Sequence, residues 1–234
     1  MPSHSLDILT SLPRVVPTKL ARLAAAWPAG AAPVRPRPSA SVVLCQDADA
    51  GLETYLLHRH ARMAFAASMA VFPGGGLDAV DQLATDPRRA CAIRETREET
   101  GVELVDDALV PWAHWITPEP HQIRYDTSFY LAALPAGQTA TDTSSETADA
   151  GWIRPEEAVA AHRVGSLLLM PPTLSILLEL VDLPSVTAAI ELGRDRVIQT
   201  VLPRVVREGG DWVFRYPQPC SDRGADDEPG NDDG

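Results

Sequence analysis

The stretch Arg94–Val102, RETREETGV, places three glutamates and two arginines before a glycine. On a helix, Glu95 lies three residues before Glu98 and four before Glu99, so the three carboxylates would share one face. Like charges at that spacing repel each other and cost stability. Arg94 can reach Glu98 at the i+4 position, and a divalent cation would offset the remaining charge. The stretch therefore indicates either a solvated helix with arginine–glutamate pairs or a site for Mg²⁺ or Mn²⁺.

The helix that would carry these glutamates has clear limits in the sequence. Asp86 is a favourable N-cap, and Pro87 suits the first helical position, where an N–H would have no partner. Gly101 suits the left-handed conformation that often follows the last helical residue. We therefore predict a helix over residues 87–100. The face opposite the glutamates would pack against a sheet through Ala90, Ile93 and Cys91.

A glycine cluster comes before this helix. The apolar run MAVF (69–72) predicts a short strand, and PGGG (73–76) follows it directly. Glycines placed after a strand indicate a sharp turn or a close approach of the backbone to a ligand. The candidate substrate-binding positions of this segment are Gly74, Gly75 and Gly76.

The strand, the segment FPGGGLD and a helix ending in EETG together resemble the Nudix hydrolases, whose signature is G-x5-E-x7-R-E-U-x-E-E-x-G-U, with U a bulky apolar residue. Residues 94–102 match its second half, with Thr96 at the first apolar position. In the first half an aspartate, either Asp81 or Asp86, replaces the glutamate, and the loop is longer. The resemblance covers roughly residues 40–155.

This resemblance implies an α/β/α sandwich with a mixed sheet, and hydrolysis of nucleoside diphosphate-linked substrates with Mg²⁺ or Mn²⁺ as cofactor. The metal ligands would be Glu95, Glu98 and Glu99, with Arg94 as a further catalytic residue. Because carboxylates alone would repel a diphosphate, a cation has to lie between the two. Glu98 is the first candidate for the general base that takes a proton from water. Other candidates lie on later loops: Glu119, Asp142 and Glu146.

Residues 56–75, LLHRHARMAFAASMAVFPGG, are similar to the motif of the coenzyme A diphosphatases. The spacing agrees from the leucine pair through Arg59 to the FPGG end. Arg59 and Arg62 are candidate substrate-binding residues, because coenzyme A carries a 3′-phosphate besides its diphosphate. Ser68 replaces a glycine of the motif, and three further positions differ: His58, His60 and Ala64. The same letters also fit an ordinary strand with alternating polar residues.

Segments 115–134 and 170–180 are similar to acyl-coenzyme A diphosphatases, which favours coenzyme A or acyl-coenzyme A as substrate, cleaved to 3′,5′-ADP and a phosphopantetheine. ADP-ribose or a related dinucleotide is the alternative, because Pro118 lies sixteen residues after Val102, as in ADP-ribose diphosphatases. An alternative of another class is a catalytically silent nucleotide-binding module. Such modules usually lose the signature glutamates, which are present here.

The composition limits the partners. The net charge of -12 argues against nucleic acid, because phosphate backbones bind positive surfaces. Three unpatterned cysteines indicate a reducing compartment and no zinc site. No apolar run reaches the length of a membrane span, and no signal peptide is expected, so we predict a cytoplasmic protein without a membrane partner. The partner would be a small nucleotide substrate. The sequence leaves open whether the protein forms a homodimer.

The other elements predict an α/β (α+β) fold with helices added at the C-terminal end. Strands are expected at 40–46, 53–59, 112–117, 127–134, 150–153, 197–206 and 211–217, the first two as a hairpin. Further helices are expected at 18–27, 155–163, 171–183 and 185–195.

We divide the chain into an N-terminal extension and linker (1–39), a Nudix domain with C-terminal helices (40–218) and an acidic disordered tail (219–234). Order is expected to begin near Ala40. Three tryptophans are expected to pack in the core rather than to stack on a base: Trp112, Trp115 and Trp152.

Overall fold

The computed structural model describes residues 8–28, 30–59, 68–143 and 147–217. The strands of its main sheet are β1 (Arg37–Ala48), β2 (Gly51–Arg59), β3 (Ala70–Val71), β4 (Gly74–Gly76), β5 (Val110–Ile116), β6 (Tyr125–Ala133), β7 (Thr147–Ile153) and β8 (Thr200–Val201). They follow the order β3-β2-β1-β6-β5-β8, with β4 also paired to β1 and β7 to β2. The sheet is mixed, because β1 runs parallel to β6 and β5 runs antiparallel to it.

Strand β1 lies inside the sheet and is buried on both faces. Val42 and Leu44 belong to one apolar core, whereas Val43 and Cys45 belong to the other. Because side chains alternate along a strand, the continuous apolar run VVLC can fill both cores at once. The sheet is therefore the middle layer of three.

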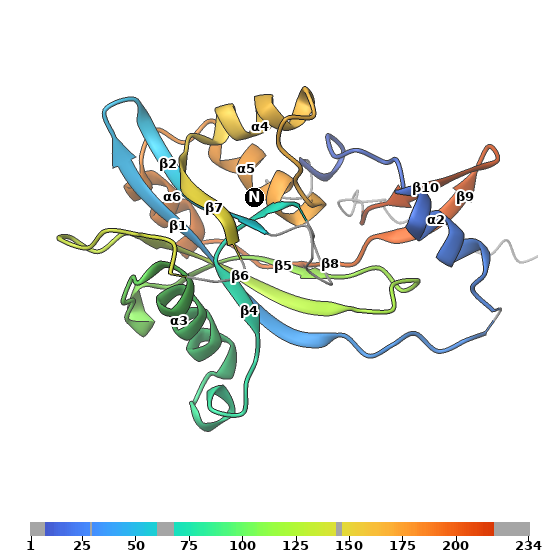
Figure 1. Ribbon diagram of the computed structural model, residues 1–234, viewed down its shortest axis with the longest axis horizontal. Coiled ribbons are helices and arrows are strands. Elements are labelled where there is room, and N and C mark those ends of the chain that lie inside the picture. The colour runs from blue at the N-terminus through green and yellow to red at the C-terminus, as the bar shows by residue number, and fades with distance from the viewer. Residues whose placement is uncertain (1–7, 29, 60–67, 144–146, 218–234) are drawn as a thin grey trace, which may run out of the picture.

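Helix α3 (Pro87–Thr100) covers one face of the sheet, and three helices contribute to the core on the other: α4 (Pro155–Arg163), α5 (Pro171–Leu180) and α6 (Val186–Arg194). Figure 1 shows α3 and the pair α4 and α5 on opposite sides. The predicted α/β/α sandwich with a mixed sheet and C-terminal helices is confirmed. Within the described ranges no helix is long and apolar enough to cross a membrane.

Most predicted elements are present, including the hairpin of β1 and β2, but two differ. The segment 197–206, expected as one strand, is divided into β8 and β9 (Arg204–Glu208). Pro203 lies between the two strands. It interrupts the strand because proline has no backbone N–H to donate to a neighbouring strand. The glycine cluster 74–76 does not form a turn; it is strand β4, which pairs with β1.

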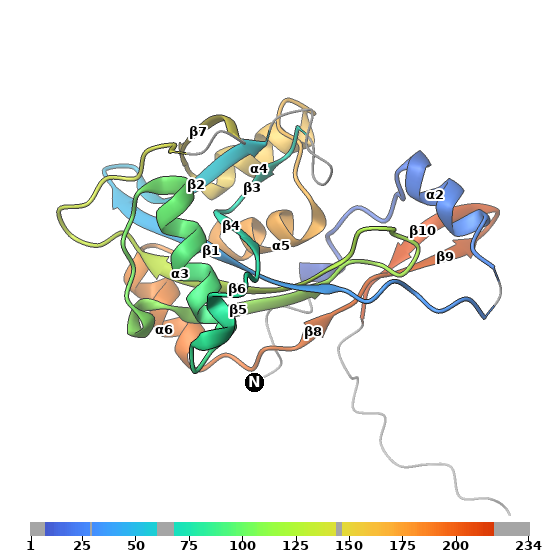
Figure 2. The same cartoon turned by 60° about the horizontal axis from the view of Figure 1, so that its bottom comes forward.

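The N-terminal segment is packed, although the sequence suggested a linker. Helix α2 (Thr18–Ala25) lies beside the hairpin of β9 and β10 (Asp211–Arg215), as both views show (Figure 1 and Figure 2). Apolar side chains before and within α2 are buried in the same core as Phe214: Leu9, Leu12, Val16 and Leu20. Order therefore begins well before Ala40. The predicted tail 219–234 lies outside the described residues.

Candidate active site

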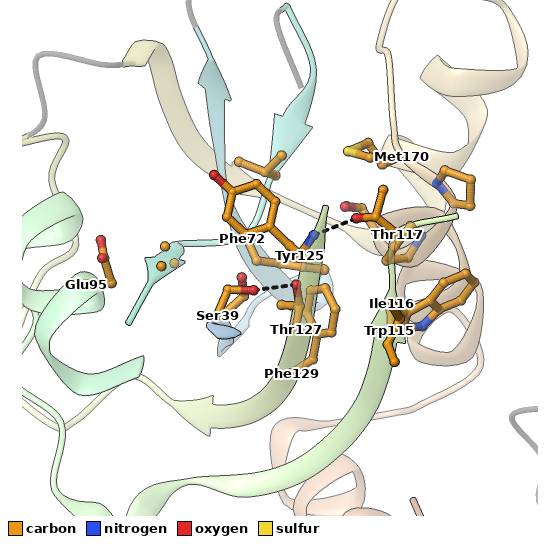
Figure 3. A pocket seen from close by; sticks show the side chains of 18 of the residues that line it. Ser39, Phe72, Glu95, Trp115, Ile116, Thr117, Tyr125, Thr127, Phe129 and Met170 are labelled. Atoms are coloured by element: carbon orange, nitrogen blue, oxygen red, sulfur yellow. Dashed lines mark hydrogen bonds between the residues drawn. The ribbon is translucent and has the colours of Figure 1, made fainter. Parts of the chain in front are cut away.

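A cavity of about 680 Å³ opens between strand β4, helix α3 and the ends of β5 and β6. Its polar end contains the three glutamates of the signature together with Gly74, Gly75 and Gly76. Its apolar end consists mainly of Phe72, Trp115, Phe129, Met170 and Phe214. Figure 3 shows Glu95 on one side and the labelled aromatic side chains on the other. The structure therefore brings the predicted metal ligands and the predicted glycine site to one place.

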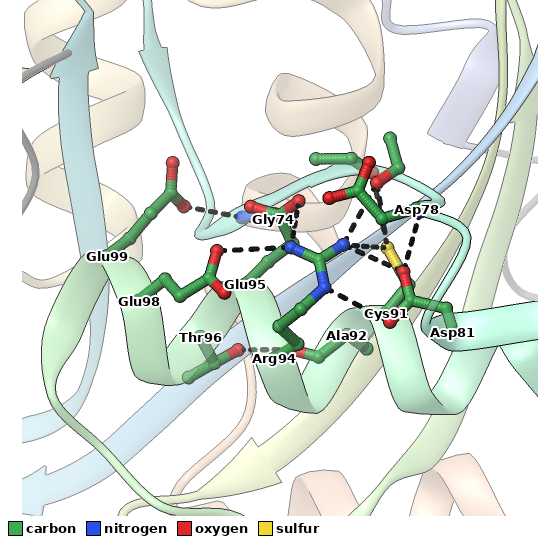
Figure 4. Close-up of polar contacts among 12 residues, drawn as sticks. Gly74, Asp78, Asp81, Cys91, Ala92, Arg94, Glu95, Thr96, Glu98 and Glu99 are labelled. Atoms are coloured by element: carbon green, nitrogen blue, oxygen red, sulfur yellow. Dashed lines mark hydrogen bonds and ion pairs between the residues drawn. The ribbon is translucent and has the colours of Figure 1, made fainter. Parts of the chain in front are cut away.

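Arg94 is the centre of the polar end (Figure 4). Its guanidinium donates to both carboxylate oxygens of Asp81, at 3.1 and 2.8 Å, and to the Gly76 carbonyl oxygen at 3.1 Å. It also donates to Glu95 at 2.9 Å and to Glu98 at 3.1 Å, the latter across the predicted i+4 spacing. The arginine therefore joins the loop before α3 to two of the glutamates.

The two aspartates that could fill the signature position differ in their surroundings. Asp86 caps α3, because its carboxylate accepts from the backbone N–H groups of Arg88 at 3.0 Å and Arg89 at 3.2 Å. Asp81 faces Arg94, and its side chain is only 2% exposed. Hydrogen bonds from Arg94 hold the pKa of Asp81 below its usual range. Asp81 therefore belongs to the site, whereas Asp86 defines the start of the helix.

Strand β4 lies directly against α3. The backbone N–H of Gly74 donates to Oε2 of Glu99 at 2.8 Å. Gly75 leaves no room for a side chain, because a Cβ there would lie 2.4 Å from Oε1 of Glu95. Glycine at position 75 is therefore required for the close approach between this strand and the glutamate helix.

The buried face of α3 differs from the predicted one. Cys91 is buried, but Ala90 and Ile93 are only half-buried. Thr96 is buried instead, and its hydroxyl donates at 2.8 Å to the carbonyl oxygen one turn earlier, which satisfies this polar group in an apolar position. Glu99 is 8% exposed. The inward face therefore includes part of the glutamate cluster, because Glu99 turns towards β4.

The donor set fits a hard divalent cation. The carboxylates of Asp81, Glu95 and Glu98 each contact Arg94, and Glu99 lines the same cavity as Glu95 and Glu98. Burial raises the pKa of Glu95 even though Arg94 donates to it, so a cation would stabilise its charged form. In the described part of the chain no three acidic, histidine or cysteine side chains already enclose a common point. Mg²⁺ is commonly bound through one or two protein carboxylates and completes its shell with water and substrate phosphate, so Glu95, Glu98 and Glu99 are the residues that could hold it.

Gly75→Ala is expected to weaken the binding of Mn²⁺ by at least about tenfold, because the added Cβ would displace the carboxylate of Glu95. Isothermal titration calorimetry with the metal alone measures this. Gly76→Ala is the matched control, since no atom lies within 4 Å of a Cβ at that position. Equal affinities for the two variants would show that the close approach of β4 does not position the metal ligands.

Several predicted residues are not placed at the site. Arg59 is the last residue of β2, and its side chain, like the whole of Arg62, lies outside the described residues. Glu119 and Asp142 are not among the described residues that line the cavity. Glu146 lies outside the described ranges. Of the base candidates that the structure describes, Glu98 lines the cavity.

The cavity also includes residues that the sequence did not single out. His121 lines it, and burial together with nearby Arg124 lowers the pKa of this imidazole, which is therefore neutral near pH 7. Tyr125 and Thr127 line the cavity from β6. In the sequence, His121 is a polar residue in a turn, and Tyr125 and Thr127 alternate with other residues along a strand. Many surface segments show the same features, so they do not identify a binding site.

The tryptophans pack as predicted, with one addition. Trp112 is fully buried, and Trp152 packs edge-on against Tyr55 with ring centroids 5.2 Å apart. Trp115 is 5% exposed and also lines the cavity. Trp115 therefore packs in the core and also forms part of the apolar end of the cavity.

Ser68 has a left-handed backbone conformation, with φ at 60°. It occupies the position where the coenzyme A motif has glycine, the residue for which this conformation carries no steric cost. We expect Ser68→Gly to raise the free energy of unfolding by about 0.5–1 kcal/mol, measured by urea denaturation. Ser11→Gly, at an exposed serine without positive φ, should give no gain. A similar gain in both variants would exclude relief of backbone strain as the cause.

Comparison with known proteins agrees with this geometry. The NUDIX domain model matches residues 35–169, which is more than half of the chain. Nudix hydrolase 7 of Caenorhabditis elegans is 28% identical over 152 residues, and an acyl-coenzyme A diphosphatase of Xenopus laevis is 30% identical over 69 residues. These matches cover 50% and 28% of this chain. The chain spans only 52% and 18% of the lengths of these two relatives.

A solved structure shares the fold. The NUDIX hydrolase of Alicyclobacillus acidocaldarius aligns with a TM-score of 0.61 and 22% identity, over 68% of this chain and 97% of that one. The family match spans β1 to β7 and includes the glycine strand, the glutamate helix and the polar end of the cavity. The chain therefore belongs to the Nudix family.

Proposed function

We propose that this protein is a hydrolase of nucleoside diphosphate-linked substrates that uses Mg²⁺ or Mn²⁺. The observation that carries the proposal is the polar end of the cavity, where three signature glutamates and Arg94 lie against a strand of glycines. A divalent cation held there would supply the positive charge that lets an anionic diphosphate lie beside carboxylates. Membership of the Nudix family supports the same reaction class.

The residues of the polar end would have different roles in the reaction. Glu98 has the most exposed carboxylate of those that Arg94 contacts, at 51%, so it is best placed to take a proton from the attacking water. Glu95 and Glu99 are fixed by Arg94 and Gly74 and would hold the cation. Arg94 positions Glu95 and Glu98, so their carboxylates keep their orientation before substrate arrives.

For the substrate we propose coenzyme A or an acyl-coenzyme A, cleaved to 3′,5′-ADP and a phosphopantetheine. The motif at residues 56–75 supports this, and so does the left-handed Ser68 at its glycine position. The partial similarity to an acyl-coenzyme A diphosphatase agrees with it. ADP-ribose is the second candidate, because Pro118, the residue that resembles the ADP-ribose branch, lines the cavity.

A hydrolysis panel tests the proposal. Coenzyme A, an acyl-coenzyme A, ADP-ribose and NADH would each be incubated with Mg²⁺ and, separately, with Mn²⁺, and products identified by mass. We expect 3′,5′-ADP from the coenzyme A substrates and no product with Glu98→Gln. If ADP-ribose were the only substrate hydrolysed, with AMP as a product, ADP-ribose would replace coenzyme A as the proposed substrate. Binding of these nucleotides without turnover would identify a silent binding module.

A further inference from the structure

The apolar end of the cavity is closed by a part of the chain outside the matched family region. Phe214 on β10 and Pro203 before β9 both line the cavity, and both follow residue 169, where the family match ends. Phe214 is 8% exposed and belongs to the same core as Trp115. Residues beyond the matched family region therefore form part of the wall at the apolar end, together with Trp115 and Phe129 from within that region.

The N-terminal segment holds this wall in place. The backbone N–H of Phe214 donates to the carbonyl oxygen of Arg14 at 2.8 Å, and Nε of Arg14 donates back to the carbonyl oxygen of Phe214 at 3.2 Å. The hydroxyl of Tyr216 donates to the Pro13 carbonyl oxygen at 3.2 Å. These bonds join two segments about 200 residues apart in the chain. The position of the Phe214 ring therefore depends on the N-terminal segment, not on the hairpin alone.

The wall offers apolar contact more than hydrogen bonding. The side chains of this end are mainly hydrocarbon: Phe72, Trp115, Phe129, Met170 and Phe214. The Thr117 hydroxyl accepts from the Tyr125 backbone N–H at 3.0 Å, and Thr127, nearer the glycine strand, shares a hydrogen bond with Ser39 at 2.6 Å (Figure 3). A nucleobase needs hydrogen-bond partners for its edge, whereas an aliphatic chain needs only contact area. The apolar end therefore suits a chain of methylene groups better than a base.

We propose that Phe214 is a specificity-determining residue that contacts an aliphatic group at the end of the substrate remote from the diphosphate, and that the N-terminal segment positions it. The proposal rests on the proposed diphosphate hydrolysis. The glutamates and the glycine strand would act on any diphosphate that reaches them. Phe214 would decide how well a long apolar group is bound while this happens.

The test compares acetyl-, hexanoyl- and dodecanoyl-coenzyme A as substrates of the wild type and Phe214→Ala. We expect Phe214→Ala to raise KM for the dodecanoyl substrate by about tenfold or more, because contact with the ring is lost. The KM for the acetyl substrate and all kcat values should stay unchanged. Val205→Ala is the matched control, because Val205 pairs with Phe214 across the hairpin but does not line the cavity. Phe214→Leu, which keeps an apolar side chain, should fall between wild type and Phe214→Ala.

An equal change across the three substrates, or the same pattern in Val205→Ala, would overturn the proposal. If the wild type hydrolyses none of them, their binding is followed by intrinsic tryptophan fluorescence, to which Trp115 in the cavity contributes. Affinity that rises with chain length and is reduced in Phe214→Ala would support the role of the wall although the proposed function has failed. Affinity independent of chain length would overturn it.

Discussion

Glu98→Gln is expected to lower kcat for the substrate that the panel identifies by about 10²–10⁴-fold, the usual contribution of a general base. Glutamine keeps the size of the side chain but cannot accept a proton from water. The free energy of unfolding should change little, because the Glu98 side chain is 51% exposed and its interaction with Arg94 is one of several that this arginine makes. Steady-state kinetics and urea denaturation of the same preparation measure both quantities.

Glu103→Gln is the matched control for this variant. Glu103 is an exposed glutamate shortly after α3, and its backbone, not its side chain, bonds Gln138. Its activity should equal that of the wild type. A loss of less than tenfold in Glu98→Gln would move the role of general base to another residue, with His121 as the next side chain to replace because it lines the same cavity as a neutral imidazole.

Arg94→Gln is expected to lower the free energy of unfolding by about 3–5 kcal/mol at neutral pH. The guanidinium is the partner of Asp81, whose side chain is 2% exposed, and of Glu95, whose side chain is 16% exposed. Its removal leaves buried carboxylates without a compensating charge. Arg97→Gln on the same helix is the control, because Arg97 is exposed and its loss should cost less than about 0.5 kcal/mol. Similar losses in both variants would show that the ion pairs around Arg94 do not stabilise the fold.

The stability difference between wild type and Arg94→Gln is expected to shrink as the pH falls below about 4. Arg94 lowers the pKa of Asp81 in the folded state, so the ionised form stabilises the fold above the unfolded-state pKa. That contribution is lost as the pH falls through the lower, folded-state pKa. Urea denaturation at a series of pH values measures the difference, and a constant difference would mean that Asp81 is not responsible.

Several elements could be predicted from local signals in the sequence. Asp86, Pro87 and Gly101 set the ends of α3, and the cap and left-handed residue of the structure are the predicted ones, because capping depends on side chains within a few residues of the helix end. The spacing of Glu95, Glu98 and Glu99 also predicted that they lie on one side of the helix, because residues three and four positions apart are neighbours on a helix surface. The run VVLC also identified the strand at 40–46, whereas its burial on both faces is seen only in the structure.

Features that depend on contacts between distant segments could be seen only in the folded chain. The choice between Asp81 and Asp86 could not be made from spacing, because the loop between them and the glycines has an irregular length, and only the fold shows which carboxylate meets Arg94. The glycine cluster indicated a sharp turn or a close approach of the backbone to a ligand, whereas the structure shows Gly75 close to the Glu95 side chain. Phe214 carried no signal at all. Its place in the cavity follows from bonds to Arg14, and a contact between residues 200 positions apart leaves no periodic pattern along the chain.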